Sequence, residues 1–272
     1  MMRWTIVVSV LGTLLATGGC LSAEGDVLLA PGGDLGDGCA ELSCPSPQPG
    51  MATVCGRVID LETSQPITES PPEVRIVDFT GSIEFAELEV DSCGRFSAQV
   101  FGAGLLSVVH TGGIPETGGY RQVASVADIE IGGIQQVTAY ALRADTDSRW
   151  AQAAGLDDDG FGVQGAQAAI FVDITQPAVA PLQGTPVTGA SLVVNGVFSP
   201  AQEFYFADEA PEQRSEIVST AQSTGQNGTG ILREGTVATY GGSHPNCTFS
   251  EQIVAARIAG VIQVQEITGT CQ

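Results

Sequence analysis

Lysine is absent from this chain of 272 residues, and all ten of its basic residues are arginine. Against 31 aspartates and glutamates, this gives a formal net charge of −21 at pH 7. Proteins that bind nucleic acid or anionic lipid surfaces need a basic patch that attracts phosphate groups. The composition therefore argues against nucleic acid as a partner and predicts an acidic, solvated surface.

Aromatic residues are scarce as well, at 6%, whereas the chain holds 35 glycines and many valines, threonines and serines. This composition favours short strands and turns over helices. Beyond the first twenty residues there is no long apolar run, so we expect no transmembrane helix in the mature chain.

Signatures of common hydrolases and metal sites are also missing. The sequence has no Gly-x-Ser-x-Gly nucleophile motif, no pair of histidines at helical spacing and no Cys-x-x-Cys pair. Carboxylates are plentiful, but no spacing marks one pair as the acid and base of a glycosidase. These absences favour a non-enzymatic protein without catalytic residues.

Residues 1–20 have the features of a secretory signal. Arg3 is followed by an apolar run over residues 6–16 and then by small residues that lead to Cys20. This end resembles the bacterial lipobox, although Thr17 stands where leucine is usual. The resemblance implies that Cys20 carries lipid and becomes the mature N-terminus. Because Leu21 replaces the aspartate typical of inner-membrane retention, we expect the outer membrane, facing the periplasm or the cell surface. An ordinary cleaved signal is the alternative.

The remaining cysteines are even in number, which in an exported chain predicts structural disulfides. We expect Cys247 and Cys271 to pair, because they are the only two cysteines in the C-terminal half. The other four would pair among themselves, either as two local links or as Cys55 with Cys93 and Cys39 with Cys44. The sequence does not decide between these connectivities.

Residues 21–50 are rich in Gly, Asp, Ser and Pro, which predicts a flexible acidic tether that holds the folded part away from the membrane. Short apolar and β-branched runs follow, separated by Gly or Pro at the spacing of a β-sandwich. The expected strands of the first half cover residues 54–59, 74–78, 83–90, 95–101, 105–110, 121–131 and 136–143.

Three motifs in this half carry a family resemblance. They are Val54-x-Gly56-x-Val58-x-Asp60, Thr63-x-x-Pro66-Ile67 and Asp91-x-x-Gly94-x-Phe96. With them, residues 51–145 resemble the carboxypeptidase regulatory-like, or transthyretin-like, domain of bacterial surface lipoproteins. The resemblance implies an antiparallel β-sandwich with no chemistry of its own.

A short helix and an acidic turn are expected to link two domains over residues 146–163. Asp145 to Ser148 would cap a helix that continues through Ala154 and ends at Gly155. The run Asp157, Asp158 and Asp159 offers oxygen ligands for calcium, but it lacks the alternating spacing and the distal glutamate of an EF-hand. We interpret it as an acidic turn and keep a calcium site as the alternative; no other cofactor is expected.

Residues 164–272 repeat the strand pattern and predict a second β-sandwich. Strands are expected at 167–174, 191–194, 197–199, 203–208, 253–258 and 261–267, with a tight hairpin turn at Asn195-Gly196. The motif Thr224-x-x-Asn227-Gly228-Thr229 resembles the turn before a strand in the same superfamily, which implies a second transthyretin-like domain.

Tyr240 and His244 are the candidate residues for a metal-dependent enzyme. Intradiol dioxygenases build a related sandwich and bind iron with two tyrosines and two histidines. Here Tyr205, Tyr240 and His244 fall in one half, but the closely spaced second histidine is missing, and His110 lies in the other half. A loop aromatic and a polar cap are the alternative interpretation.

Together these features predict an all-β protein: two antiparallel β-sandwich domains, transthyretin-like or immunoglobulin-like, joined by a short helix and carried on a lipid-anchored tether. We expect a non-enzymatic surface or periplasmic lipoprotein with a binding or structural role, whose partner is a protein, a glycan or a cell-wall component. The alternatives are the iron enzyme and a calcium-stiffened adhesion or structural module. The sequence identifies neither the ligand nor the oligomeric state.

Overall fold

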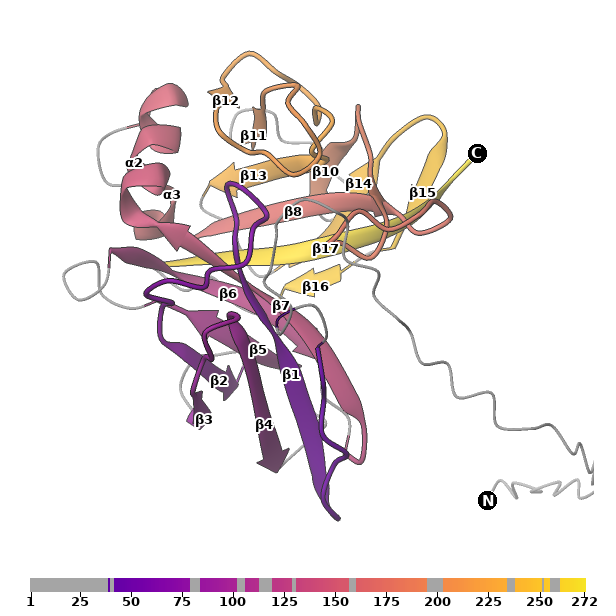
Figure 1. The fold of residues 1–272 in the computed structure, drawn as a ribbon. Coiled ribbons are helices and arrows are strands. Elements are labelled where there is room, and N and C mark those ends of the chain that lie inside the picture. The colour runs from indigo at the N-terminus through magenta and orange to yellow at the C-terminus, as the bar shows by residue number, and fades with distance from the viewer. Residues whose placement is uncertain are drawn as a thin grey trace, which may run out of the picture.

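The computed structural model describes residues 39, 42–78, 84–101, 106–112, 119–128, 131–156, 160–194, 203–233, 238–250, 252–254 and 260–272. The described backbone is mostly strand, as the composition predicted, with two short helices on one side (Figure 1). None of the helices in these ranges is long and apolar enough to span a membrane. The signal segment and Cys20 lie outside the described residues.

The first half contains seven strands that pack around one apolar cluster. β1 is the central strand of one layer, because it pairs antiparallel with β4 and parallel with β7. The other layer runs antiparallel from β3 through β2 and β5 to β6. The strands are β1 (Met51–Asp60), β2 (Val74–Asp78), β3 (Glu84–Leu88), β4 (Arg95–Phe101), β5 (Leu106–Thr111), β6 (Tyr120–Asp128) and β7 (Ile134–Arg143).

The second half has a main sheet and a smaller three-stranded sheet. In the main sheet β12, β11, β13 and β8 are successive antiparallel neighbours, and the small sheet has the order β10, β14, β16. The strands are β8 (Ala166–Asp173), β9 (Thr185–Pro186), β10 (Ser191–Val194), β11 (Glu203–Phe206), β12 (Ile217–Val218), β13 (Thr229–Arg233), β14 (Ala238–Ser243), β15 (Cys247–Phe249), β16 (Gln252–Val254) and β17 (Val261–Cys271).

The last strand, β17, joins the two halves into one sheet. It lies parallel to β8 along most of its length and also parallel to β6 of the first half, with Ile262 opposite both Ala166 and Val123. Figure 1 shows β17 in yellow crossing the molecule between β8 and β6. The separate second sandwich that the sequence predicted is therefore not confirmed.

The core is shared across this junction. Ile59, Tyr140 and Leu142 from the first half pack in the same buried cluster as Trp150, Phe161 and Ile231. Each of these side chains is at most 3% exposed. Burial of this size is the main stabilising term in folding, so neither half can leave the other without exposing apolar surface.

Two helices cover one edge of this cluster. α2 (Ala144–Ala153) is followed by Gly155 at φ +73°, a left-handed backbone conformation that suits glycine and ends the helix as predicted. Its start differs from the prediction, because Asp147 does not cap α2. The Asp147 carboxylate instead accepts hydrogen bonds from the backbone N–H groups of Phe161 and Gly162, so it caps the next helix, α3 (Gly160–Gln164).

Strand boundaries in the first half agree closely with the sequence prediction, whereas β14 was missed. The sequence prediction offered Tyr240 as a metal ligand or a loop aromatic and placed no strand at this segment. In the structure Gly242 lies so close to the rings of Phe171 and Phe249 that a Cβ atom there would come within 2.6 Å of both. Glycine is therefore required by packing, not by a turn. The predicted Asn195-Gly196 hairpin lies outside the described residues.

Candidate functional site

Two disulfides attach the end of the predicted tether to the first half. Cys39 pairs with Cys93 in the turn before β4, and Cys44 pairs with Cys55 in β1. Neither expected alternative is therefore right: Cys55 does not pair with Cys93, and of the two observed links only Cys44–Cys55 is local, because Cys39 and Cys93 are 54 residues apart. In the β1–β4 register Cys55 lies opposite Ser97, four residues beyond Cys93. That offset is about 13 Å along the strand, which is too far for a disulfide.

The segment between these cysteines and β1 is bound to the sheet as well. Gln99 in β4 accepts a hydrogen bond from the Gln48 backbone N–H and donates from its amide to the carbonyl of Ser46 and the hydroxyl of Thr53. Arg57 donates to the carbonyl of Cys39. Residues 46–50, expected as part of the flexible tether, are therefore bound to the sheet, while residues 21–38 of that expected tether lie outside the described residues.

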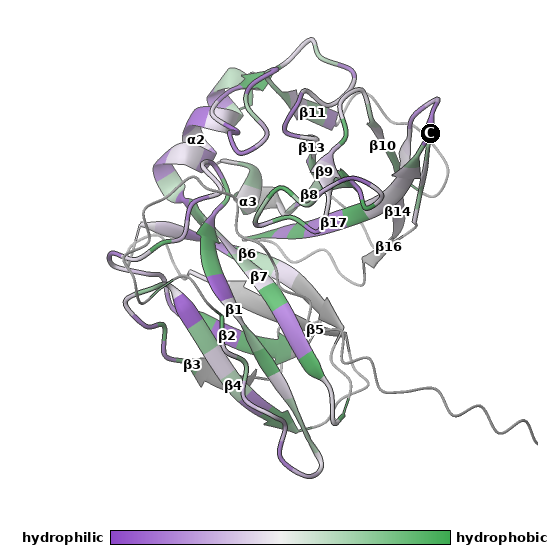
Figure 2. Ribbon diagram, turned by 45° about the vertical axis from the view of Figure 1, so that its right-hand side comes forward, coloured by the Kyte–Doolittle hydropathy of each residue, from purple (hydrophilic) through white to green (hydrophobic). Residues whose placement is uncertain are grey.

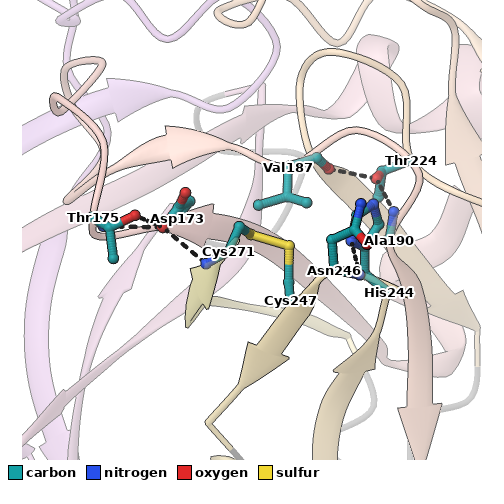
Figure 3. The surroundings of a disulfide bond; sticks show 9 residues. All are labelled: Asp173, Thr175, Val187, Ala190, Thr224, His244, Asn246, Cys247 and Cys271. Carbon is teal, nitrogen blue, oxygen red and sulfur yellow. Dashed lines mark hydrogen bonds between the residues drawn. A yellow bond between two sulfur atoms is a disulfide. The ribbon is translucent and has the colours of Figure 1, made fainter.

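The third disulfide closes the other end of the chain, as the sequence predicted. Cys247 in β15 pairs with Cys271, one residue before the C-terminus, and the two residues are also directly opposite in the β15–β17 register. Beside it, one oxygen of Asp173 accepts hydrogen bonds from the backbone N–H and the hydroxyl of Thr175 and from the Cys271 N–H (Figure 3). Those donors lower the pKa of the Asp173 carboxyl.

His244 lies on the other side of this disulfide, at the end of β14. Its Nδ1 accepts a hydrogen bond from the Asn246 backbone N–H over 3.2 Å (Figure 3). The ring edge faces Gly189, where a Cβ atom would lie 3.6 Å from Nε2. The half-buried imidazole thus holds a turn, the role of polar cap that the sequence offered as an alternative.

The two tyrosines of the iron hypothesis are buried in the second half. Tyr240 has no exposed surface and packs with Phe171 and Leu192. The Tyr205 hydroxyl donates to Glu203 and accepts from the Leu192 N–H, and burial together with the Glu203 contact raises the pKa of Tyr205. Both tyrosines therefore serve packing in this arrangement.

Over the described ranges, no three His, Cys, Asp or Glu side chains come together as a metal site would require. His110 lies in β5 of the first half, so it does not join His244. Asp157, Asp158 and Asp159 lie outside the described residues, and the calcium alternative stays a prediction.

A buried charged network at the junction of the halves was not foreseen. Arg214 is fully buried and donates to the carbonyl of Leu61, to the Ser64 hydroxyl and to the Thr229 hydroxyl. Its backbone N–H also donates to the carbonyl of Glu62. Arg214 stands between Glu212 and Glu216 in the sequence, which predicts a solvated turn, so no local signal marked it. Burial lowers the pKa of its guanidinium.

Glu266 of β17 is a partly buried acidic residue near Arg214 at the junction of the two halves. It accepts a hydrogen bond from the Tyr140 hydroxyl of β7 over 3.3 Å and one from the Gln183 backbone N–H over 3.1 Å. Burial raises the pKa of Glu266, and burial together with the Glu266 charge raises that of Tyr140. These contacts tie the C-terminal strand to the first half.

Comparisons with known proteins give the chain no family. No protein-family model matches it, and no curated protein is significantly similar in sequence. Among solved structures, the shaft pilin SpaA from Lactobacillus rhamnosus GG is similar at a TM-score of 0.22 and 9% identity, covering 82% of this chain and 98% of that one. A candidate carbohydrate-binding protein from Bacteroides uniformis is similar at a TM-score of 0.26 and 10% identity, covering 77% and 95%. The pilus backbone protein RrgB from Streptococcus pneumoniae is similar at 0.23 and 10%, covering 78% and 60%. At TM-scores this low the similarities support no argument about function.

Proposed function

We propose that this protein is a non-enzymatic lipoprotein of the bacterial cell envelope, anchored through Cys20 and acting as a structural or binding module. The observation that carries the proposal is the disulfide between Cys39 and Cys93. It joins the first described residue after the signal and tether directly to the folded body. A mechanical force applied at an N-terminal anchor would thus be transmitted to the Cys39–Cys93 disulfide before it acted on any strand.

The other disulfides support the same proposal. Cys44–Cys55 fastens the middle of β1 and Cys247–Cys271 fastens the end of β17, so strands of both halves are crosslinked. Disulfides persist in exported proteins and are rare in reducing compartments. Chain ends are otherwise where proteins fray and where proteases cut.

Lipid attachment is tested by metabolic labelling. The full chain, expressed in a bacterium with a lipoprotein pathway, is expected to incorporate labelled palmitate and to fractionate with the outer membrane. Cys20→Ala should lose the label, and Thr17→Leu, which restores the usual lipobox residue, should keep it. An unlabelled wild-type protein released as soluble chain would contradict the anchor.

A binding role would use the turns around the Cys247–Cys271 disulfide, where His244 and Asn246 lie beside crosslinked strands (Figure 3). The His244 ring also faces Gly189 there. The testing probe is purified cell-wall sacculi. We expect the chain to sediment with them and His244→Ala to weaken this several-fold, while Gln152→Ala, at an exposed position of α2, leaves it unchanged. No sedimentation of the wild type would reject cell-wall binding and leave the structural role.

The proposal also includes the finer architecture. We regard residues 51–145 as a carboxypeptidase regulatory-like module to which the C-terminal segment has been joined through β17. The parallel pairing of β17 with β6 supports this view, because it extends the sheet of the first half at an edge.

A further inference from the structure

Exposed apolar side chains gather at one end of the first half. Phe101 is 66% exposed, Ile131 60% and Ile134 49%, and among the described residues only Ile174, at 51%, is a comparable exposed large apolar residue. We call the first three the apolar tip. Isolated exposed apolar residues are ordinary, but a cluster marks an interaction site.

The strand register places these three residues together. Phe101, the last residue of β4, lies opposite Met51, the first residue of β1. On the other side of β1, the Gly132 N–H donates to the Met51 carbonyl and Ile134 lies opposite Thr53. The end of β4, the start of β1 and the start of β7 meet at the bottom of Figure 1, and Figure 2 shows the same end from another side.

This end is also free of charge along its three strands. Residues 42–56, 96–109 and 131–142 contain no Asp, Glu or Arg, in a chain of net charge −21. Acidic residues lie close to this end in the sequence, because Asp78 ends β2, Asp128 ends β6 and Glu130 directly precedes Ile131. Apolar residues with acidic neighbours in the sequence suit a neutral apolar environment and disfavour anionic surfaces.

We propose that the apolar tip inserts into the lipid bilayer to which Cys20 is anchored, so that the folded body is held at the membrane at two points. The proposal rests on the proposed function for the presence of that bilayer. A tip of three large side chains is too small for a stable protein interface, which takes about 20 residues a side. Membrane binding scales with the apolar area buried in the bilayer, and stable anchoring takes two signals, so a few large side chains can add to a lipid anchor.

The chain length permits both attachments. Cys39 is crosslinked beside the start of β4, near Arg57 of β1, and the tip lies about 20 Å away, six residues back along β1. A chain from Cys20 to Cys39 spans up to about 60 Å when extended. The anchor and the tip can therefore reach the same membrane surface.

Vesicle flotation of the mature chain from Leu21, without the lipid, tests the tip independently of the anchor. We expect it to float with phosphatidylcholine vesicles and to bind less as phosphatidylglycerol is added, because the protein is acidic. Phe101→Ser and Ile131→Ser should each weaken binding at least several-fold, whereas the matched control Ile174→Ser should not. Equal thermal unfolding of all variants would show that the fold is intact.

A second readout locates the contact. Trp150 is the only tryptophan after the signal segment and is 1% exposed, so a tryptophan introduced by Phe101→Trp can be followed against it. Vesicles should shift the emission of Phe101→Trp to the blue and leave Ile174→Trp unchanged. Absence of wild-type flotation, or a dimer in solution that Phe101→Ser abolishes, would overturn the proposal. Failed palmitate labelling with intact flotation would instead refute only the Cys20 anchor.

Discussion

Asp147 in α2 and Arg121 in β6 form an ion pair over 2.9 Å in which the carboxylate is fully buried. Burial raises the pKa of Asp147 even though Arg121 and two backbone N–H groups favour its charged form. The pair links the first half to both helices. Buried pairs of this kind become costly when one partner is removed, because the other is left uncompensated.

Asp147→Ala should therefore lower the free energy of unfolding by about 3 kcal/mol, since it removes the buried carboxylate that pairs with Arg121 and leaves two N–H groups of α3 without their acceptor. Urea unfolding followed by Trp150 fluorescence measures the change. Gln152→Ala, at an exposed position of the same helix, is the control and should change stability little. A loss under about 0.5 kcal/mol for Asp147→Ala would mean that the pair is not formed.

The shared core predicts that the two halves unfold together. Ile262 of β17 contacts the junction cluster from between β6 and β8, so Ile262→Ala should cost about 3 kcal/mol and move one calorimetric transition as a whole. Ile174→Ala, at an exposed site, is the matched control. Two transitions, of which Ile262→Ala moves one, would show independent domains.

The raised pKa of Glu266 predicts a pH dependence of stability. A carboxyl whose pKa is higher in the folded than in the unfolded chain binds its proton more tightly when folded. Stability therefore falls as the pH rises from the unfolded value, about 4.3, through the folded value. Glu266→Gln removes this loss, so the free energy of unfolding of the variant should rise relative to that of the wild type between pH 4 and pH 8. Urea unfolding of both proteins at the two pH values measures the difference. An equal difference at both pH values would refute the raised pKa.

The C-terminal disulfide should contribute about 3 kcal/mol, given a sequence separation of 24 between its cysteines. The double substitution Cys247→Ser/Cys271→Ser is expected to lose that amount in urea unfolding and to become sensitive to carboxypeptidase digestion. Thr270→Ser, at the exposed neighbouring position, should behave as the wild type. Unchanged stability of the double variant would show that the crosslink does not constrain the unfolded chain.

Much of the strand pattern followed from local sequence, while the long-range pairings did not. Glycines and prolines bounded the strands of the first half, and Gly155 marked the end of α2. The parallel contact of β17 with β6 joins residues more than a hundred positions apart, which no local pattern encodes. For the same reason the sequence left the connectivity of Cys39 and Cys44 open.

Among the site residues, too, local sequence indicated some features, whereas long-range packing determined others. His244 was predicted either as a metal ligand or as a polar cap, and β14, which ends just before it, was not predicted. Gly242 within that strand is required by the packing of Phe171 and Phe249, which local sequence does not show. Arg214 was missed because its neighbours are acidic and predict an exposed turn. Its burial depends on carbonyl groups of Leu61 and Glu62, which fold back from the other half.

Whether this protein is oxidised and lipid-anchored can be measured as the intact mass of the chain, extracted from membranes and alkylated on its thiols without reduction. The expected mass is that of residues 20–272 with lipid on Cys20, six hydrogens fewer for the three disulfides and no alkyl group. A mass that corresponds to a chain beginning at Met1, without lipid and with alkyl groups on the cysteines, would contradict an oxidised and lipid-anchored protein.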